Sequence, residues 1–196
     1  MNLDLRDQTQ LYLGLFERET YPWLIRLSRR IRTAVDIGAA EGEYTLFFLT
    51  KTKATEVYAF EPDANCLRIL NENLELNNMA QSQRLEMSTK FVGDSEDGQQ
   101  IRLDSLVGSI HSPCLIKMDV DGAEEYILRG AKMLNALPDI RWLIETHSQQ
   151  LETACERILS LAGFHIRIIR NAPWRVTIPE LRPIPHNRWL AGWKNA

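Results

Sequence analysis

Four charged residues lie close together where an apolar run of the chain ends. The stretch LIKMDVDGAEEYILRGA, residues 115–131, begins as an apolar run and takes on helical spacing after a glycine. Lys117, Asp119, Asp121 and Glu124 fall at this junction. Glu124 suits the positive end of the following helix dipole, but a plain turn does not need the other three. Carboxylates beside a lysine are typical of a site that moves a substrate proton, so we expect acid–base chemistry here.

Several residues near this junction are candidates for a general base. A base positioned on a substrate hydroxyl contributes roughly 10²–10⁴-fold to the rate. We predict the catalytic residues to be Asp119, Asp121, His147, Lys117 and Glu145, with Lys117 as the electrostatic partner of Asp119 or of the acceptor. His147 is attractive because the unperturbed pKa of histidine is near 6.5. Structural roles stay open: Asp121 as an N-cap, His147 at the surface, and Lys117 with its stem along apolar surface.

The same acids and His147 are also able to hold a divalent cation that polarises a hydroxyl. No tight metal-ligand spacing occurs in the sequence, and convergence of ligands from two strands does not follow from one sequence. We therefore predict no metal, and keep a metal-assisted reaction as the alternative.

A glycine-bracketed loop, VDIGAAEG at residues 35–42, leads straight into an apolar helix. A dinucleotide fingerprint starting at Gly38 needs glycine at its third and sixth positions, which here are Ala40 and Glu43. A glutamate facing phosphates is electrostatically poor. The spacing from Gly38 to Gly42, led by Asp36, instead fits a ligand with an amino-acid end and a nucleoside: Asp36 attracts an ammonium group and loop amides serve a carboxylate. A plain strand-to-helix turn is the structural alternative.

Two further acids follow later strands. Glu61 closes the run VYAFEP, and a carboxylate there can accept hydrogen bonds from two ribose hydroxyls at once. Asp94, in VGDSEDG, is placed to accept from an adenine amino group. Their alternatives are a helix N-terminal acid for Glu61 and an ordinary Asx turn for Asp94.

The elements that must position these residues alternate along the chain. Strand patterns cover the start of 33–49, then 56–62, a weaker run in 83–98, 114–120, 140–147, 164–170 and 187–193. Helical spacing covers 11–30 with a break at residues 21–22, the end of 33–49, and 63–78, 123–137 and 148–163. Such alternation predicts a parallel sheet covered on both faces, with its ligand at the carboxyl ends of the strands. The predicted site residues end successive strands, so we expect them at one edge.

Composition narrows the class of protein. The chain has 196 residues, 44% hydrophobic and 25% charged, and a net charge of −3, which gives no general basis for nucleic-acid binding. Its three cysteines are Cys66, Cys114 and Cys155; they are far apart and form no CxxC motif, so we expect reduced thiols, no disulfide and no zinc in a cytoplasmic protein. The polar start is not that of a signal peptide, and no apolar run approaches the roughly 20 residues of a membrane span.

Together, the blocks VDIGAAEGEYT, VYAFEPD, RLDSL, LIKMDVDGAEEYILRGA and LIETH resemble the FkbM family of S-adenosylmethionine-dependent methyltransferases. The resemblance covers roughly residues 33–147, and the family loop commonly has Asn where this chain has Ala40. It implies an α/β, three-layer, Rossmann-like class I methyltransferase fold, whose seven-stranded sheet is mostly parallel with an antiparallel last strand. The length of 196 residues suits one domain, so we expect one methyltransferase domain over 1–196, with an N-terminal helical segment at 1–32 and the core at 33–196.

The implied reaction is methyl transfer from S-adenosylmethionine to a hydroxyl oxygen of a sugar, lipid or secondary metabolite. We expect no nucleic-acid partner. The predicted cofactor-binding residues are Asp36, Gly38, Ala39, Glu41, Gly42, Tyr44, Thr45, Glu61, Pro62, Asp94 and Asp119. A nicotinamide-dependent oxidoreductase and a catalytically silent cofactor-binding protein are the alternative functions.

Overall fold

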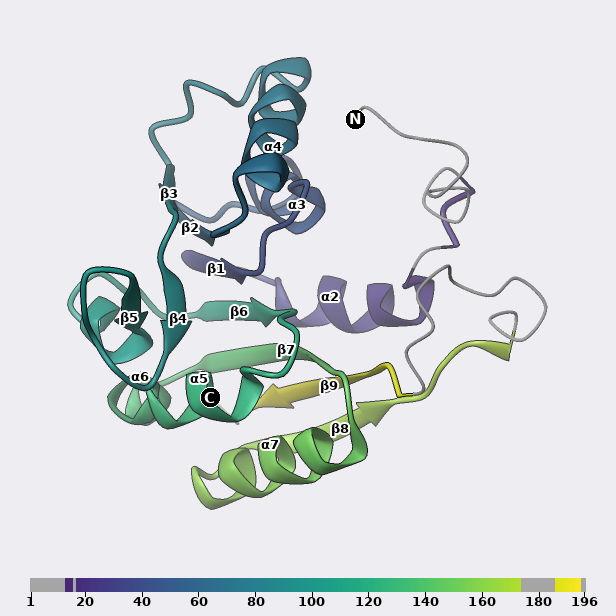
Figure 1. Cartoon of the computed structure of the whole chain (residues 1–196). Helices are drawn as coiled ribbons and strands as arrows, with labels where there is room; N and C mark the ends of the chain where they lie inside the picture. The colour runs from purple at the N-terminus through teal and green to yellow at the C-terminus, as the bar shows by residue number, and fades with distance from the viewer. Residues whose placement is uncertain (1–12, 16, 174–185, 195–196) are drawn as a thin grey trace.

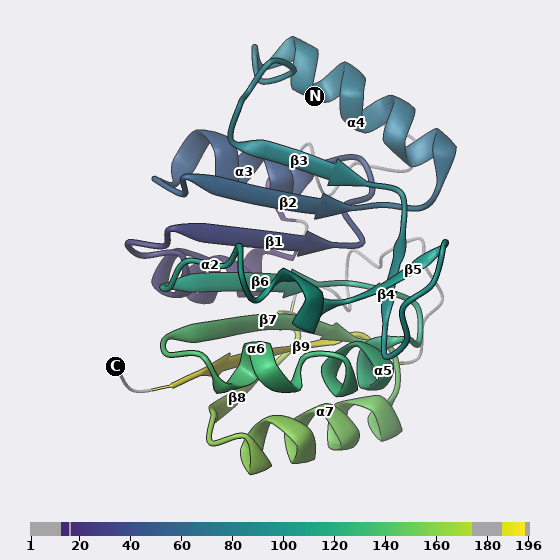
Figure 2. The same ribbon diagram turned by 90° about the vertical axis from the view of Figure 1, so that its left-hand side faces the viewer.

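The computed structural model describes residues 13–15, 17–173 and 186–194. Seven strands form one sheet in the order β3-β2-β1-β6-β7-β9-β8 (Figures 1 and 2). The strands are β1 (Thr33–Ile37), β2 (Glu56–Phe60), β3 (Leu85–Ser88), β6 (Cys114–Met118), β7 (Ile140–Thr146), β8 (His165–Ile169) and β9 (Arg188–Trp193). The pairings among β3, β2, β1, β6 and β7 are parallel, whereas β9 runs antiparallel to both β7 and β8. The predicted fold class is therefore confirmed.

Helices cover both faces of the sheet, giving three layers (Figure 2). One core contains buried residues of α2 (Tyr21–Leu27), α3 (Glu43–Lys51) and α4 (Ala64–Leu76). The core on the other face contains residues of α5 (Glu124–Arg129), α6 (Lys132–Ala136) and α7 (Gln149–Leu161). Every residue of β1 and β6 is buried, as expected for central parallel strands with helices on both sides.

Side-chain caps fix the start of the two longest helices. The Asp63 carboxylate accepts from the amides of Asn65 and Cys66 at 2.8 and 2.9 Å and so forms the N-cap of α4. The Ser148 hydroxyl accepts from the Leu151 amide at 3.1 Å at the start of α7. These caps begin the helices directly after the carboxyl ends of β2 and β7, where site residues are expected.

The first helix is shorter than the predicted helical segment 11–30, of which residues 11, 12 and 16 lie outside the described part. A short 3-10 helix, η1 (Arg18–Thr20), precedes α2, which has a proline in its first turn. The break predicted at residues 21–22 is therefore the start of the helix. Proline has no backbone N–H and is favoured in the first turn, where that donor would have no intrahelical acceptor.

The predicted third strand, 83–98, is divided. Its first part is β3, and its second is β4 (Phe91–Gly93), which pairs with an unpredicted strand, β5 (Gln100–Arg102), in a separate two-stranded sheet. A second short 3-10 helix, η2 (Leu103–Leu106), follows. Figure 2 shows β4 and β5 beside the carboxyl ends of the central strands.

The single helix predicted over 123–137 is also divided, into α5 and α6. The division lies at Gly130, where an added Cβ would come within 2.0 Å of the Gly93 carbonyl oxygen. Only glycine permits this close approach to β4, and glycine disfavours a continuous helix. The division therefore places β4 against α5, next to the carboxyl edge of the sheet.

All three cysteines are free, as predicted, and burial raises the pKa of the Cys66 thiol to about 11 and that of Cys155 to about 12. No helix in the described part of the chain has the length and apolar composition needed to cross a membrane.

Candidate active site

The loop after β1 passes very close to the end of β6. Gly38 has a φ of +72°, and an added Cβ would come within 1.9 Å of the Asp119 carbonyl oxygen, so only glycine fits. The amides of Gly38 and Ala39 both donate to the Phe60 carbonyl at 3.0 Å. The Ala40 amide donates to the Glu61 carboxylate at 2.8 Å. These three loop amides, which we expected to serve a ligand carboxylate, are thus used within the protein.

Asp36 and Lys117 form a buried ion pair beneath this loop. Lys117 Nζ lies 3.3 Å from Asp36 Oδ1 and donates to the Gly38 carbonyl at 2.7 Å. The Thr45 hydroxyl donates to Asp36 at 2.6 Å. Burial raises the pKa of Asp36, which Lys117 partly offsets. Because Asp36 is 0% exposed, its carboxylate pairs with the internal cation Lys117 and not with the ammonium group of a ligand.

Lys117 also lies close to a second carboxylate, that of Asp119. Its Nζ lies 3.8 Å from Asp119 Oδ2 and 4.9 Å from the centre of the Tyr44 ring. Burial opposes the charge of Lys117, but Asp36 and then Asp119 raise its pKa above the ordinary lysine value. The predicted role as electrostatic partner of Asp119 fits this geometry, and a buried, charged lysine is no nucleophile at neutral pH.

A cavity of about 370 Å³ opens at the carboxyl ends of β1, β2 and β6. Five residues predicted for the site line it: Gly38, Glu61, Pro62, Asp119 and Asp121. Its other lining residues are Ile37, Ala40, Phe60, Lys90, Phe91, Val92, Val120 and Ala123. The cavity lies where the strand order reverses between β2, β1 and β6, which is the expected ligand position in such sheets.

The segment around β4 contributes side chains that the sequence analysis missed. Lys90, Phe91 and Val92 line the cavity, and Phe91 is 58% exposed. The apolar pair Phe-Val in STKFVGD was the available indication, but it was interpreted as part of a sheet strand. Asp94, predicted to contact adenine, is exposed beyond the end of β4 and does not line the cavity.

The remaining predicted cofactor residues do not line the cavity: Asp36, Ala39, Glu41, Gly42, Tyr44 and Thr45. Tyr44 is instead directed to the N-terminal segment, where its hydroxyl donates to the Glu17 carboxylate at 2.7 Å. Gly42, with a φ of +96°, forms the N-cap of α3. These residues shape the loop and its support.

Glu61 is held in place by two backbone amides. One carboxylate oxygen accepts from Ala40 at 2.8 Å and the other from Asp63 at 2.9 Å. A carboxylate has about four acceptor positions, so both oxygens can still accept from hydroxyls in the cavity. Glu61 is 7% exposed, which gives it a fixed orientation at the cavity wall.

A second polar group lies at the ends of β6 and β7, beside the cavity. His147 Nε2 lies 3.6 Å from Asp119 Oδ1, 3.5 Å from Asp121 Oδ1 and 3.6 Å from Glu145 Oε2. The other ring nitrogen, Nδ1, lies 2.9 Å from the buried carboxylate of Glu124. The structure thus brings together four of the five predicted catalytic residues, with Glu124 added.

The electrostatics of this group separate the candidates for the base. Burial and then the nearby Asp119 carboxylate raise the pKa of Glu145 to about 11, so without a bound cation Glu145 is protonated at neutral pH. Burial opposes the charged form of His147, but the hydrogen bond to Glu124 and the surrounding carboxylates raise its pKa. Asp119 both lines the cavity and faces His147, which makes it the best-placed proton acceptor.

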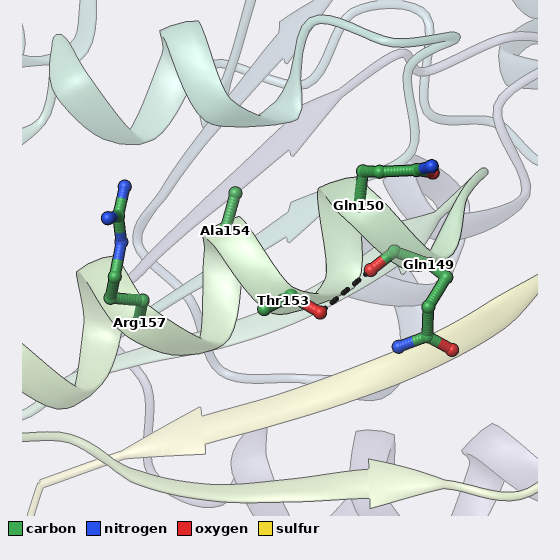
Figure 3. Close-up of a pocket in the computed structure, with 5 residues that line it drawn as sticks. All are labelled: Gln149, Gln150, Thr153, Ala154 and Arg157. Atoms are coloured by element: carbon green, nitrogen blue, oxygen red, sulfur yellow. Dashed lines mark hydrogen bonds between the residues drawn. The ribbon is translucent and has the colours of Figure 1, made fainter.

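A larger hollow of about 430 Å³ lies along α7 (Figure 3). It is lined by Gln149, Gln150, Thr153, Ala154 and Arg157, all on that one helix. The Thr153 hydroxyl donates back to the Gln149 carbonyl at 2.9 Å, and no acid or histidine lines the hollow. The chemistry therefore assigns the site to the smaller cavity at the sheet edge.

Comparisons with known proteins support the fold. No protein-family model matches the sequence, and no curated protein matches it significantly. Among solved structures, the chain is similar to methyltransferase FkbM from Methylobacillus flagellatus KT, at a TM-score of 0.64 and 22% identity over 83% of this chain. It spans 43% of that structure's chain.

Two further structures have lower identity to this chain. One is an rRNA methylase from Streptococcus thermophilus, at a TM-score of 0.58 and 13% identity, covering 90% of this chain and 93% of that one. The other is a SAM-dependent O-methyltransferase from Thermotoga maritima, at 0.59 and 14%, covering 92% and 65%. The shared feature is the class I methyltransferase fold.

Proposed function

We propose that the chain is an S-adenosylmethionine-dependent methyltransferase that methylates a hydroxyl oxygen of a sugar, lipid or secondary metabolite. The observation that carries the proposal is the cavity at the switch point of the sheet, with the Glu61 carboxylate on one wall and Asp119 on the other. The three free thiols support a place in the reducing cytoplasm. The whole chain, 1–196, is proposed as one catalytic domain.

Each wall of the cavity has a chemical task in this proposal. Glu61, oriented by two amides, accepts hydrogen bonds from the ribose hydroxyls. Phe91 and Val92 offer apolar contact to the adenine ring. The nucleoside therefore lies between β2 and β4, with its reactive end directed toward Asp119.

The reaction is an in-line displacement. The sulfonium donor supplies an activated methyl group; the new carbon–oxygen bond forms as the carbon–sulfur bond breaks, and the sulfur leaves as a neutral thioether. The acceptor hydroxyl loses its proton to Asp119, which His147 and Lys117 hold in place. Because the donor is already activated, orientation of the acceptor oxygen is a main contribution of the protein.

Calorimetric titration tests the cofactor assignment. S-adenosylmethionine and S-adenosylhomocysteine should bind, whereas NAD should give no saturable heat. Glu61→Ala should weaken binding by about 1–3 kcal/mol, the scale of leaving buried hydroxyls unpaired. The control is Glu86→Ala, an exposed glutamate on the neighbouring strand β3. Equal affinity of folded Glu61→Ala and Glu86→Ala proteins would show that the ribose lies elsewhere.

The acceptor class needs a separate screen. Sugars, lipids and phenolic metabolites should be tested with a labelled methyl donor, and structured RNA should be included because a similar fold occurs in an rRNA methylase. Transfer to a hydroxyl compound supports the proposal. Transfer to RNA alone would overturn the acceptor assignment.

A further inference from the structure

His147 lies at the centre of carboxylates from three neighbouring elements. Asp119 and Asp121 follow β6, Glu145 lies in β7, and Glu124 begins α5. Lys117 is the nearby cation, but its ammonium group lies closer to Asp36 than to Asp119. The group around His147 therefore places four carboxyl side chains beside one imidazole ring.

Three buried atoms in this group have no hydrogen-bond partner among the residues that the structure describes: Glu124 Oε2, His147 Nε2 and Glu145 Oε1. The side chains of His147 and Glu145 are 9% and 3% exposed, so bulk water does not satisfy their two atoms. The contact of Nδ1 with Glu124 fixes the imidazole ring so that Nε2 is directed at Asp119, Asp121 and Glu145. A histidine oriented in this way by a carboxylate is the arrangement typical of metal ligands.

The spacing of the ligand atoms suits one metal ion. Donor atoms of Asp119, Glu145 and His147 lie within 4.8 Å of one another. Two ligands bound to the same ion at about 2.0–2.2 Å are separated by roughly 3–4.4 Å, depending on the angle between them. Small side-chain movements therefore bring all three to one centre.

We propose that Asp119, Glu145 and His147 bind a divalent first-row transition-metal ion, with Asp121 at its exposed rim. An imidazole nitrogen with carboxylate oxygens favours such an ion over Mg²⁺ or Ca²⁺, which prefer oxygen ligands alone. Because Asp119 also lines the cavity, an ion held by these residues would be within reach of an acceptor bound there.

The role of this ion rests on the proposed function. An acceptor hydroxyl coordinated to the ion loses its proton more easily, because the ion stabilises the alkoxide. With the ion bound, Asp119 acts as its ligand instead of as the proton acceptor, and the proton passes to Asp121, whose side chain is 86% exposed, and from there to water. The oxygen then attacks the methyl carbon as the carbon–sulfur bond breaks.

The test is a titration of the chelator-treated protein with Mn²⁺. Electron paramagnetic resonance measures the concentration of free Mn²⁺ at each step. The wild-type chain should bind about one Mn²⁺. His147→Asn should weaken binding by about 100-fold or more, and Glu124→Gln by roughly 10–100-fold because it orients the ring. The control is His111→Asn, which removes an exposed histidine paired with Glu56 at the opposite end of the strands and should leave binding unchanged.

Asp119→Asn serves as the second ligand variant if His147→Asn fails to fold, and it should weaken Mn²⁺ binding to a similar degree. Failure to bind Mn²⁺ in the wild type, or equal binding by the ligand variants and His111→Asn, would overturn the metal site. Calorimetry with S-adenosylhomocysteine on the metal-free protein separates the two proposals. Cofactor binding without Mn²⁺ binding would refute the proposed metal site alone. Mn²⁺ binding without cofactor binding would refute the proposed reaction and support the metal site.

Discussion

Replacing Lys117 tests whether its buried ion pair with Asp36 stabilises the fold. Lys117→Met keeps the length of the side chain and its apolar stem but removes the cation beside Asp36. The Asp36 carboxylate is fully buried, so it must then either remain charged without a partner or take up a proton on folding. Protonation on folding costs less free energy than burying an unpaired charge. The free energy of protonation therefore sets how far the variant is destabilised.

The magnitude follows from the ordinary carboxyl pKa of 3.8. Protonating Asp36 costs about 4 kcal/mol at pH 7 and about 1.5 kcal/mol at pH 5. The lost hydrogen bond to the Gly38 carbonyl adds about 1 kcal/mol at either pH. Burial already raises the folded-state pKa of Asp36 in the wild type, and Lys117 partly offsets this, so removing Lys117 raises that pKa further. The stability of the variant therefore falls more steeply than that of the wild type as pH rises. The deficit of Lys117→Met should therefore grow between pH 5 and pH 7.

Urea unfolding at several pH values, with chelator present, measures this deficit. The double variant Asp36→Asn with Lys117→Met is the matched control, because the asparagine is neutral and can still accept from Thr45. Its deficit should be about 1–2 kcal/mol and independent of pH. A deficit of Lys117→Met that is below 1 kcal/mol, or equal at pH 5 and pH 7, would refute the buried ion pair.

The remaining predictions concern four other features. Burial raises the pKa of Glu43 to about 7, so Glu43→Gln should stabilise the protein by about 1–3 kcal/mol at pH 8 and by nothing below pH 4.5, measured by urea unfolding; a pH-independent effect would contradict this. Gly130→Ala should cost about 2–4 kcal/mol because its Cβ meets the Gly93 carbonyl, whereas Gly98→Ala, with open space around it, should cost under 1 kcal/mol; similar thermal midpoints would count against the close contact. All three cysteines should react with a thiol reagent in denatured, unreduced protein, and fewer would show a disulfide. Asp119→Asn should lower turnover by about 10²-fold with little change in S-adenosylmethionine affinity, and normal turnover would exclude it as the base.

Much of the architecture follows from local patterns in the sequence. The largely apolar runs of β1 and β6, every residue of which is buried, require cover on both faces, and their alternation with helices leaves few topologies other than a doubly wound sheet. That topology in turn brings Asp36, Glu61 and Asp119 to one edge. The resemblance of the sequence blocks to a methyltransferase family supplied the antiparallel last strand.

The secondary-structure predictions are wrong where tertiary contacts outweigh the local preference of the sequence for a helix or a strand. Residues 123–137 have the spacing of one helix, but the approach of Gly130 to Gly93 interrupts it. Residues 83–98 have the composition of one strand, yet β4 leaves the main sheet to pair with β5 and to place Phe91 at the cavity. Neither contact is encoded by nearby residues.

For the candidate site, too, the sequence predicted which residues take part but not how their side chains are arranged. Sequence spacing identified Asp119, Asp121, Glu145 and His147 as candidates but did not show that their side chains converge on one histidine. Convergence depends on the register of β6 against β7, which is fixed by the packing of the whole sheet. The internal pairing of Asp36 with Lys117 is likewise a three-dimensional result, although the two residues occupy paired positions of adjacent strands.

A crystal structure of the protein soaked with S-adenosylhomocysteine would show directly where the cofactor binds. We predict the nucleoside in the cavity at the ends of β1, β2 and β6, with both ribose hydroxyls within hydrogen-bond distance of the Glu61 carboxylate and the sulfur directed toward Asp119. Binding in the hollow along α7, or in the cavity with the ribose turned away from Glu61, would contradict it.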